Sequence, residues 1–221
     1  MTPAALPPNA ESRVPFLVDQ SRHAEVTRVL CDAFHDYPVM RYVVGSQGTA
    51  YDEHLRAMIG YFVQARFLHS DPVLAVAEAG ELVAVATLAA PGAPEEPPPV
   101  SPLRELMWKT LGDQARHRHG TLCEIWDRFC VNEPHYYVHM IGVSPPHQGR
   151  GYARILLDHV HALSSRHPDS VGVSLTTEDP RNVPLYEHLG YRVLGRESLG
   201  KVLDVWGFLR EDERHGPHPQ G

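Results

Sequence analysis

The spacing of apolar positions along the chain predicts helices and strands that mix over most of its length. Apolar residues three and four apart indicate helices, whereas short apolar runs between turn residues indicate strands. Up to residue 90 the pattern predicts strands over 14–19, 73–79 and 81–90, and helices over 21–37 and 52–71. An Ala79-Gly80 turn joins the last two strands as a hairpin, and the stretch between the two helices is predicted to be a loop.

The pattern continues after a proline-rich stretch over 91–102, which is predicted to be a loop. It predicts helices over 103–114, 122–130, 154–164 and 183–189, and strands over 136–143, 171–177, 191–198 and 201–209. The start is antiparallel, the centre is strand–helix–strand, and the end is a hairpin. Together these features predict an α/β fold with a mixed, largely antiparallel central sheet of about six to seven strands flanked by helices.

The length of 221 residues suits one domain with a sizeable core. We expect this domain to span 14–210, with disordered tails over 1–13 and 211–221, because the N-terminal end is rich in proline and the C-terminal end is polar and contains prolines. Inside the domain, residues 91–134 are predicted to form a helical insertion between two strands.

Composition and charge narrow the function. The formal net charge is -7 and no basic stripe is visible, which argues against a nucleic-acid partner. The longest apolar run, 82–90, is shorter than the ~20 residues of a membrane span, and the N-terminus has no signal-peptide pattern. Three cysteines without a Cys-x-x-Cys pair fit a reducing compartment. We therefore expect a cytoplasmic protein without a membrane partner.

The stretch over 136–153 has the clearest chemical signal. Its apolar strand runs through a Ser-Pro-Pro-His turn into a glycine-rich corner over 148–153, and the corner opens a helix. The first N–H groups of a helix have no partner inside the helix, and the helix dipole favours negative charge there. Gly149 and Gly151 leave the backbone open to a ligand, and Arg150 adds a positive charge. The corner is therefore predicted to hold a pyrophosphate.

A nicotinamide-dependent oxidoreductase is a rival explanation of the same glycines. Gly149 and Gly151 match the first two glycines of the G-x-G-x-x-G fingerprint, but residue 154 is an arginine. The third glycine of that fingerprint lets the helix pack closely against the strand, so Arg154 argues against dinucleotide binding.

Two motifs resemble landmarks of the GNAT family of N-acetyltransferases. Gln148-x-x-Gly151-x-Ala153 is similar to the family's acyl-CoA signature, (Q/R)-x-x-G-x-(G/A). After the next strand, Asn182 is followed by Tyr186-Glu-His-Leu-Gly-Tyr, which resembles the family's second landmark. Because both motifs occur in the expected order and on the expected elements, the chain is identified as a member of this family.

Within the family, the stretches 142–151 and 180–186 are most similar to puromycin N-acetyltransferase-like proteins. The resemblance implies a GNAT-type fold and transfer of an acetyl group from acetyl-CoA, the co-substrate, to an amine by direct attack in a ternary complex. It also implies which residues bind the co-substrate: Ile141, Gly142, Val143, Gln148, Gly149, Arg150, Gly151, Tyr152, Ala153, Asn182 and Tyr186.

The resemblance further implies how the transfer is assisted. Backbone N–H groups around 140–143 polarise the thioester carbonyl, and Gly142 is a candidate for a bulge in that strand. Tyr186 matches the tyrosine that protonates the departing thiolate, although a core aromatic on a short helix is the alternative. Asn182 is expected to bond CoA or to fix the loop, and it can also be a helix N-cap.

The sequence leaves the general base open. His139 shares one strand face with Tyr137, lies near a histidine of arylalkylamine-type relatives, and titrates near neutral pH. A satisfied polar residue of the sheet is the plain alternative for it. Tyr137, Glu133 and Glu178 are further candidates, and no base is needed if the amine arrives neutral.

The acceptor is expected to be a small-molecule amine, with antibiotics and aromatic amines as candidates, and the insertion is expected to cover its side of the sheet. A non-catalytic acyl-CoA-binding or regulatory module is the alternative function. No metal is expected, because the histidines lack ligand spacing. The oligomeric state, a homodimer included, stays open. Candidate walls of the acceptor site are Phe34, Tyr37, Met40, Tyr42, Trp108, Trp126 and Tyr137.

Overall fold

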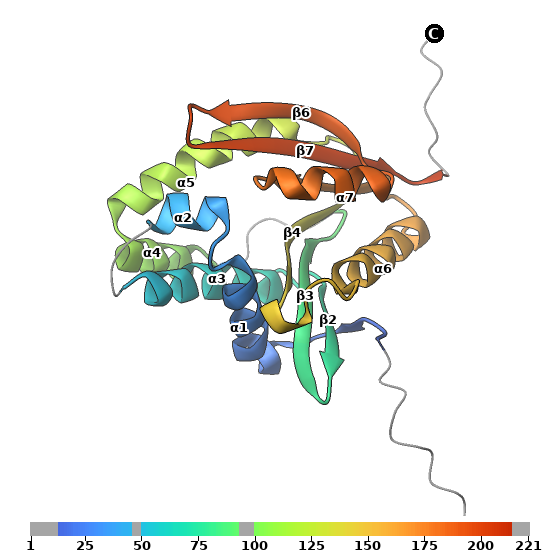
Figure 1. The fold of residues 1–221 in the computed structure, drawn as a ribbon, viewed down its shortest axis with the longest axis horizontal. Coiled ribbons are helices and arrows are strands. Elements are labelled where there is room, and N and C mark those ends of the chain that lie inside the picture. The colour runs from blue at the N-terminus through green and yellow to red at the C-terminus, as the bar shows by residue number, and fades with distance from the viewer. Residues whose placement is uncertain (1–12, 46–49, 93–99, 214–221) are drawn as a thin grey trace, which may run out of the picture.

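The computed structural model describes residues 13–45, 50–92 and 100–213. In Figure 1 a central sheet lies between groups of helices. The sheet has seven strands in the order β1-β2-β3-β4-β5-β7-β6, and among the described residues only β4 and β5 pair in parallel. The predicted mixed, largely antiparallel α/β sheet is therefore confirmed.

The elements follow one another from the N-terminus to the C-terminus as the colours of Figure 1 show. The strands are β1 (Phe16–Leu17), β2 (Val73–Glu78), β3 (Glu81–Ala89), β4 (Tyr136–Val143), β5 (Gly172–Thr177), β6 (Arg192–Leu199) and β7 (Leu203–Glu211). The α-helices are α1 (His23–Phe34), α2 (Pro38–Val44), α3 (Tyr51–Leu68), α4 (Val100–Leu111), α5 (Asp113–Trp126), α6 (Tyr152–Arg166) and α7 (Val183–His188). Short 3-10 turns are η1 (Gln20–Arg22), η2 (Asp127–Phe129), η3 (Pro145–His147) and η4 (Pro180–Asn182).

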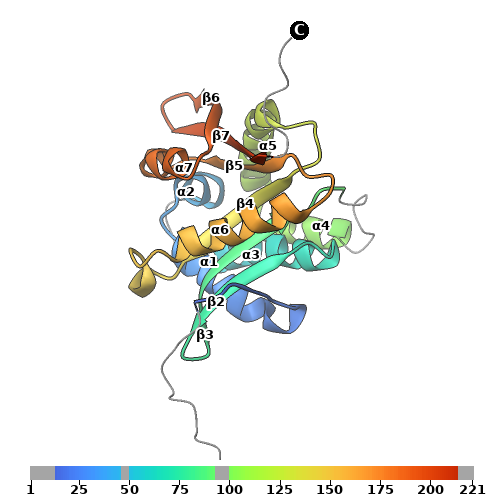
Figure 2. The ribbon, with the colours of Figure 1, turned by 90° about the vertical axis from the view of Figure 1, so that its right-hand side faces the viewer.

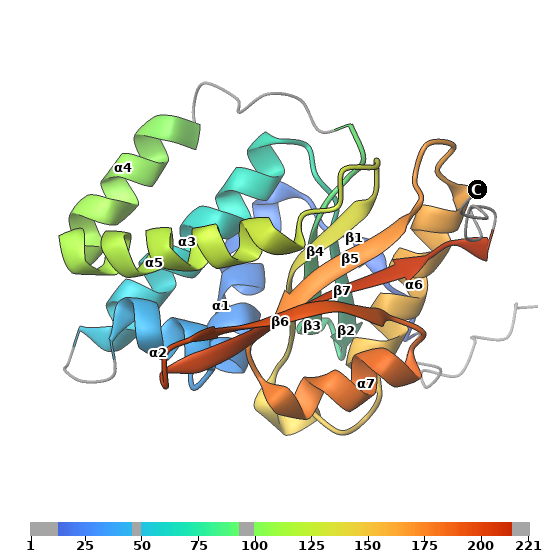
Figure 3. The same ribbon diagram turned by 90° about the horizontal axis from the view of Figure 1, so that it is seen from above.

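Two hydrophobic cores cover the two faces of the sheet. Figure 3 shows α1 to α5 on one side and α6 and α7 on the other, and in Figure 2 α6 lies in front of the sheet. Strand β2 contributes to both cores: Val73 and Ala75 pack under the first group of helices, whereas Leu74 and Val76 pack under α6. Because both faces are covered, the strand is apolar at successive positions instead of alternating with polar residues.

The sheet opens at its centre, between the parallel strands β4 and β5. These strands pair from Tyr136↔Val173 to Val138↔Leu175 and no further. Beyond that point β4 stays paired with β3, and β5 stays paired with β7. The facing edges of β4 and β5 therefore separate.

The bulge in β4 lies at His139, not at Gly142 as predicted. Two consecutive residues of β3 pair with Met140 and Val138, which leaves His139 as the extra residue between them. The sequence suggested Gly142 because glycine in a strand often marks a bulge, but this glycine has a packing role instead.

Gly142 allows α1 to lie close to β4. A Cβ at this position would lie 2.8 Å from the Cβ of Ala33 and 3.1 Å from a methyl carbon of Leu30. Contacts this short would force α1 or β4 to shift. The absence of a side chain at Gly142 therefore permits the short distance between the helix and the strand.

The predicted loop after the first helix contains α2, which the apolar pattern missed because the helix is short. Tyr37 is its N-cap and Pro38 its first residue, a position where proline's missing N–H costs little. Inside the insertion, α5 spans Asp113–Trp126 and not 122–130 as predicted. The break between α4 and α5 lies at Gly112, whose φ is 85°, and not after residue 114. Glycine at this point allows the chain to turn in a left-handed conformation.

The C-terminal strand extends slightly beyond the predicted end of the domain. β7 ends at Glu211, and the next residue, Asp212, is buried and accepts hydrogen bonds from Ser164 and Ser165 of α6. The rest of the predicted tails, 1–12 and 214–221, lies outside the described residues.

The insertion docks onto the final hairpin through Phe129. Its ring packs against Gly195 of β6 and Gly207 of β7, which pair across the hairpin. A Cβ at Gly207 would overlap the ring, so the two glycines leave the space that Phe129 occupies. Arg128 adds an ion pair with Glu197 at 3.0 Å. These contacts hold the end of α5 and η2 against the C-terminal part of the sheet.

Candidate active site

The glycine-rich corner has the geometry of an anion-binding turn. Gly149 and Gly151 have φ of 75° and 84°, a left-handed conformation that glycine adopts without strain. A Cβ built on either residue would meet nothing within 4 Å, so the space above the corner is open. Gly151 is also the N-cap of α6, and because it has no capping side chain, the first N–H groups of the helix remain available to a ligand.

The side chains of the corner differ in their contacts and in their exposure to solvent. The Gln148 amide donates to the carbonyl of Val143 at 3.1 Å, which ties the corner to the end of β4. The Arg150 guanidinium lies 3.4 Å from the Glu78 carboxylate and is about half exposed. Tyr152 is only 1% exposed. Its ring belongs to the core, so only its backbone is left for the ligand-binding role that the sequence predicted for it.

A cavity of about 90 Å³ occupies the gap between β4 and β5. It brings together three residues singled out from the sequence, Ile141, Asn182 and Tyr186. Gly142 and Val143 are not among its walls; Gly142 faces α1. The walls are Phe34, Tyr37, Val39, Met40, Val138, Ile141, Leu175, Thr176, Glu178, Asn182 and Tyr186.

Tyr186, the proton donor that the sequence predicted, lies in the wall of this gap. Its ring is 6% exposed and packs against Tyr191 and Phe208, with ring centres 5.7 and 5.4 Å away. Its hydroxyl forms no hydrogen bond within the described part of the chain. Burial, and secondly the charges of Glu178 and Asp179, raises the pKa of Tyr186. The phenol therefore keeps its proton at neutral pH until a strong base forms beside it.

Asn182 fixes the loop after β5. It occupies the N-cap position of α7, but its side chain makes no capping bond. Instead its amide donates to Thr177 Oγ1 at 3.1 Å. The Tyr37 hydroxyl bonds the same Thr177 oxygen at 2.9 Å and accepts the backbone N–H of Glu178 at 3.0 Å. The end of β5 is thus held from both sides.

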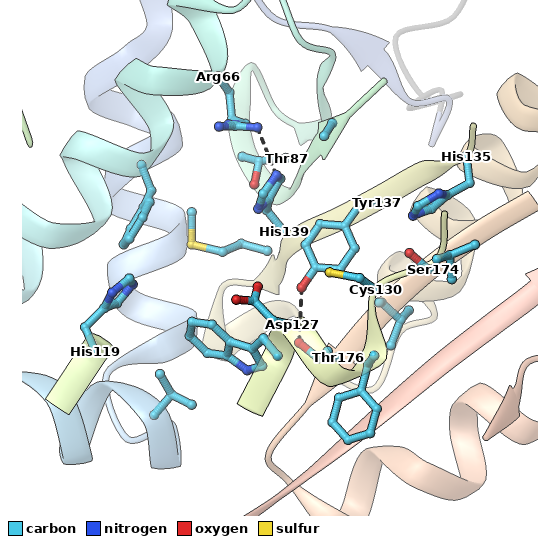
Figure 4. Close-up of a pocket in the computed structure, with 18 of the residues that line it drawn as sticks. Arg66, Thr87, His119, Asp127, Cys130, His135, Tyr137, His139, Ser174 and Thr176 are labelled. Carbon is cyan, nitrogen blue, oxygen red and sulfur yellow. Dashed lines mark hydrogen bonds between the residues drawn. The ribbon is translucent and has the colours of Figure 1, made fainter. Parts of the chain in front are cut away.

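A second, larger cavity of about 490 Å³ lies on the face of the sheet that α1 to α5 cover. Figure 4 shows side chains that line it, from α3, α5, η2 and the strands β3, β4 and β5. Of the predicted acceptor walls, Met40, Trp126 and Tyr137 belong to it, whereas Trp108 is buried in the core beside it. The insertion thus contributes to this cavity.

The two cavities meet at the centre of the sheet, where four residues line both of them: Val39, Met40, Leu175 and Thr176. Glu178 lines the smaller cavity, and its carboxylate accepts the indole N–H of Trp126, which lines the larger one, at 2.8 Å. A carboxylate therefore lies where a ligand of one cavity would meet a ligand of the other.

The Glu178 carboxyl is unusual because it is buried without a cation. Its residue is 6% exposed, and its partners are neutral hydrogen-bond donors, chiefly Trp126. Burial raises the pKa of Glu178 to about 7, against smaller lowering effects of its hydrogen bonds. A carboxylate with a pKa near neutrality is suited to accept and release protons at physiological pH.

His139 is a weaker base in this arrangement. Its Nε2 accepts a hydrogen bond from Arg66 Nη1 at 2.9 Å, so the neutral ring carries its proton on Nδ1 and has no free lone pair. Desolvation by the surrounding cavity walls, and then the positive charges of Arg66 and His69, lower the pKa of His139 to about 3. Its role as a base remains an untested prediction, and the geometry favours Glu178.

The two other base candidates are less well placed. Tyr137 bonds Thr176 Oγ1 through its hydroxyl at 3.2 Å, and burial raises its pKa to about 12. Glu133 is exposed and is not among the walls of either cavity.

Asp127 is a cavity residue to which sequence reasoning assigned no role. It follows Trp126 at the end of α5 and lines the larger cavity. No motif includes it, and an acidic residue at the end of an amphipathic helix is ordinary on a surface. Only the docking of the insertion on the hairpin turns it toward a site.

Among the described residues, no group of three or more histidine, cysteine, aspartate or glutamate side chains lies close enough to hold a metal ion. None of the helices described is both long and apolar enough to span a bilayer.

The chain matches the model of the acetyltransferase (GNAT) family over residues 22–191. It is also similar to solved structures, one being a histone acetyltransferase HPA2 and related acetyltransferase from Corynebacterium glutamicum, with a TM-score of 0.65, 19% identity, and coverage of 90% of this chain and 96% of that one. A putative acetyltransferase yncA from Salmonella typhimurium with its cofactor acetyl-CoA has a TM-score of 0.52, 17% identity, and coverage of 94% and 98%.

NAA60 from Arabidopsis thaliana, in complex with acetyl-CoA, has a TM-score of 0.53, 16% identity, and coverage of 89% of this chain and 97% of that one. Identities at this level show a common fold and leave the substrate open. The family model spans most of the chain, from the end of η1 to Tyr191. The protein therefore belongs to the acetyltransferase (GNAT) family.

Proposed function

We propose that the protein is an acetyl-CoA-dependent N-acetyltransferase that acetylates the amine of a small molecule. The observation that carries this proposal is the junction of the two cavities beside Tyr186 and Glu178. One cavity lies in the gap of the sheet that continues from the glycine-rich corner, and the other is large enough for a drug-sized molecule. A proton donor and a proton acceptor lie between them.

The donor substrate follows from the corner and the gap. Two similar structures, yncA and NAA60, contain acetyl-CoA. In this chain the open backbone at Gly149 and Gly151 and the uncapped start of α6 suit a pyrophosphate. We assign the pantetheine arm to the edge of β4 that β5 leaves unpaired, around Ile141. Acetyl-CoA supplies the acetyl group as a thioester.

The residues at the junction divide the proton transfers between them. Glu178 removes a proton from the incoming ammonium group, so that a neutral amine attacks the thioester carbonyl carbon. Backbone N–H groups around 140–143 hold the carbonyl oxygen as it gains charge. Tyr186 gives its proton to the sulfur as the carbon–sulfur bond breaks, and it recovers one from the new amide nitrogen. The products are the acetylated amine and free CoA.

A small-molecule acceptor fits the larger cavity better than a peptide. The walls are mostly apolar side chains, and the amide groups of a peptide would be buried there without partners. The resemblance of 142–151 and 180–186 to puromycin N-acetyltransferase-like proteins also supports a small amine, antibiotics included.

A non-catalytic acyl-CoA-binding module is the alternative function. It shares the corner and the gap, but it does not need a proton donor and a carboxylate of raised pKa at the junction. Calorimetry with acetyl-CoA and thiol release with a panel of primary amines separate the two functions. Absence of acetyl-CoA binding refutes both, whereas binding without transfer to any amine supports the module.

A further inference from the structure

The larger cavity has an unbalanced negative charge. Among the arginine and carboxylate side chains of its wall, Arg66 is compensated by an ion pair with the buried Asp71 at 2.9 Å. Asp127 is exposed and forms no hydrogen bond or ion pair through its side chain within the described residues. In Figure 4 its carboxylate points into the cavity. A cation entering the cavity therefore has a free partner in Asp127.

Asp127 is next in sequence to a residue that contacts the proposed reaction centre. It directly follows Trp126, whose indole N–H holds the carboxylate of Glu178. The chain thus presents two carboxylates in sequence, an accessible one in the cavity and a buried one at the junction with the gap. An ammonium group can be bound at the first and can lose its proton to the second.

The rest of the wall suits an aromatic body. Seven rings line the cavity: Phe62, His119, Trp126, Phe129, His135, Tyr137 and His139. Several of them are fixed by one another, since His119 stacks on Phe62 with ring centres 5.7 Å apart and meets the Trp126 ring edge-on at the same distance. Burial lowers the pKa of His119 to about 4, so this ring is neutral at physiological pH. Rigid neutral rings favour a flat, apolar ligand.

We infer that the acceptor is a ring-bearing primary amine without a carboxylate, and that Asp127 docks its ammonium group. This inference rests on the proposed function for the fate of the amine, but binding of the amine can be measured without any transfer. An amino acid carries a carboxylate next to its amine, and Asp127 would repel it. When the carboxylate is removed, or converted to an amide, the ammonium group keeps its positive charge and the repulsion is gone.

Three compounds with one ring test the charge: 2-phenylethylamine, L-phenylalaninamide and L-phenylalanine. Their dissociation constants are measured by calorimetry on the full chain saturated with CoA, with butylamine as an amine that has no ring. We expect the first two to bind at least about tenfold more tightly than phenylalanine and than butylamine. Equal affinity for phenylalanine overturns the role of charge, and equal affinity for butylamine overturns the role of the rings.

Asp127→Asn tests the residue itself. The substitution should weaken the binding of 2-phenylethylamine by about tenfold. It should also narrow the difference in affinity between L-phenylalaninamide and L-phenylalanine. Glu124→Gln is the matched control, because it removes a charge from an exposed position of α5, three residues before Asp127 and outside both cavities. Unchanged amine affinity in Asp127→Asn overturns the inference. If the amines bind as expected but thiol release stays absent, the proposed function fails and the binding inference stands.

Discussion

Glu178→Gln should make the protein more stable and less active. The buried carboxylate lowers the stability of the fold when it is ionised, and in the proposed mechanism it accepts the proton of the amine. The residue is 6% exposed, and burial raises its pKa from an ordinary value of 4.5 to about 7. Between these pH values the folded state keeps a proton that the unfolded state releases. The free energy of unfolding therefore falls as pH rises through this interval, and the loss is complete above about pH 7.

The magnitude follows from the difference between the two pKa values. Each unit corresponds to about 1.4 kcal/mol, so the ionised carboxylate costs up to about 3 kcal/mol above neutrality and less than about 1 kcal/mol at pH 5. Glutamine keeps an oxygen for the Trp126 indole N–H and carries no charge. The melting temperature should rise by up to about 6–12 °C at pH 8 and change little at pH 5.

Activity should move in the opposite direction. In the unsubstituted protein kcat/KM should rise with pH through an inflection near 7, as Glu178 becomes able to accept a proton. In Glu178→Gln kcat/KM should fall about a hundredfold or more, and this inflection should disappear. Thiol release followed from about pH 5.5 to 9, alongside thermal melts in the same buffers, measures both effects.

Two further variants sharpen the result. Glu133→Gln removes an exposed carboxylate outside both cavities and should leave activity and stability unchanged. The reasoning is refuted if Glu178→Gln keeps its activity with the inflection, or if it melts at a lower temperature at pH 8. If His139→Asn abolishes the inflection and Glu178→Gln does not, His139 is the base.

Three other substitutions test the proton donor, the indole bond and the packing of β4. Tyr186→Phe should lower kcat about tenfold or more while acetyl-CoA affinity measured by calorimetry is preserved, and an unchanged kcat would remove the acid role. Trp126→Phe removes a hydrogen bond that lowers the pKa of Glu178, so the inflection in the pH–rate profile should move above 7; a downward shift contradicts this. Gly142→Ala brings a Cβ to 2.8 Å from α1 and should lower the free energy of unfolding by about 1–3 kcal/mol in chemical denaturation. Gly120→Ala is its control, since nothing lies within 4 Å of a Cβ there and a helical alanine should be neutral or stabilising, so equal losses in both variants would contradict the packing argument.

The sequence by itself determined the elements whose pattern is local. Apolar periodicity predicted the strands and, except for α5, the longer helices, because side chains that face a core repeat with the period of the backbone. The glycine-rich corner was also predictable, since Gly149 and Gly151 provide positive φ and an open backbone through their own residue type. Helix α2 was missed because it is too short for a period to show.

Only the tertiary structure decided the chemistry between the two cavities. The raised pKa of Glu178 comes from burial and from neutral partners such as Trp126, which lies 52 residues away in the chain. Similarly, Arg66 of α3 occupies the lone pair of His139 Nε2, and the docking of Phe129 on the hairpin turns Asp127 toward the larger cavity. Desolvation and charge depend on what surrounds a group in space. The order of residue types along the chain does not show what surrounds a side chain in the folded protein. The sequence could therefore identify candidate site residues but could not choose among them.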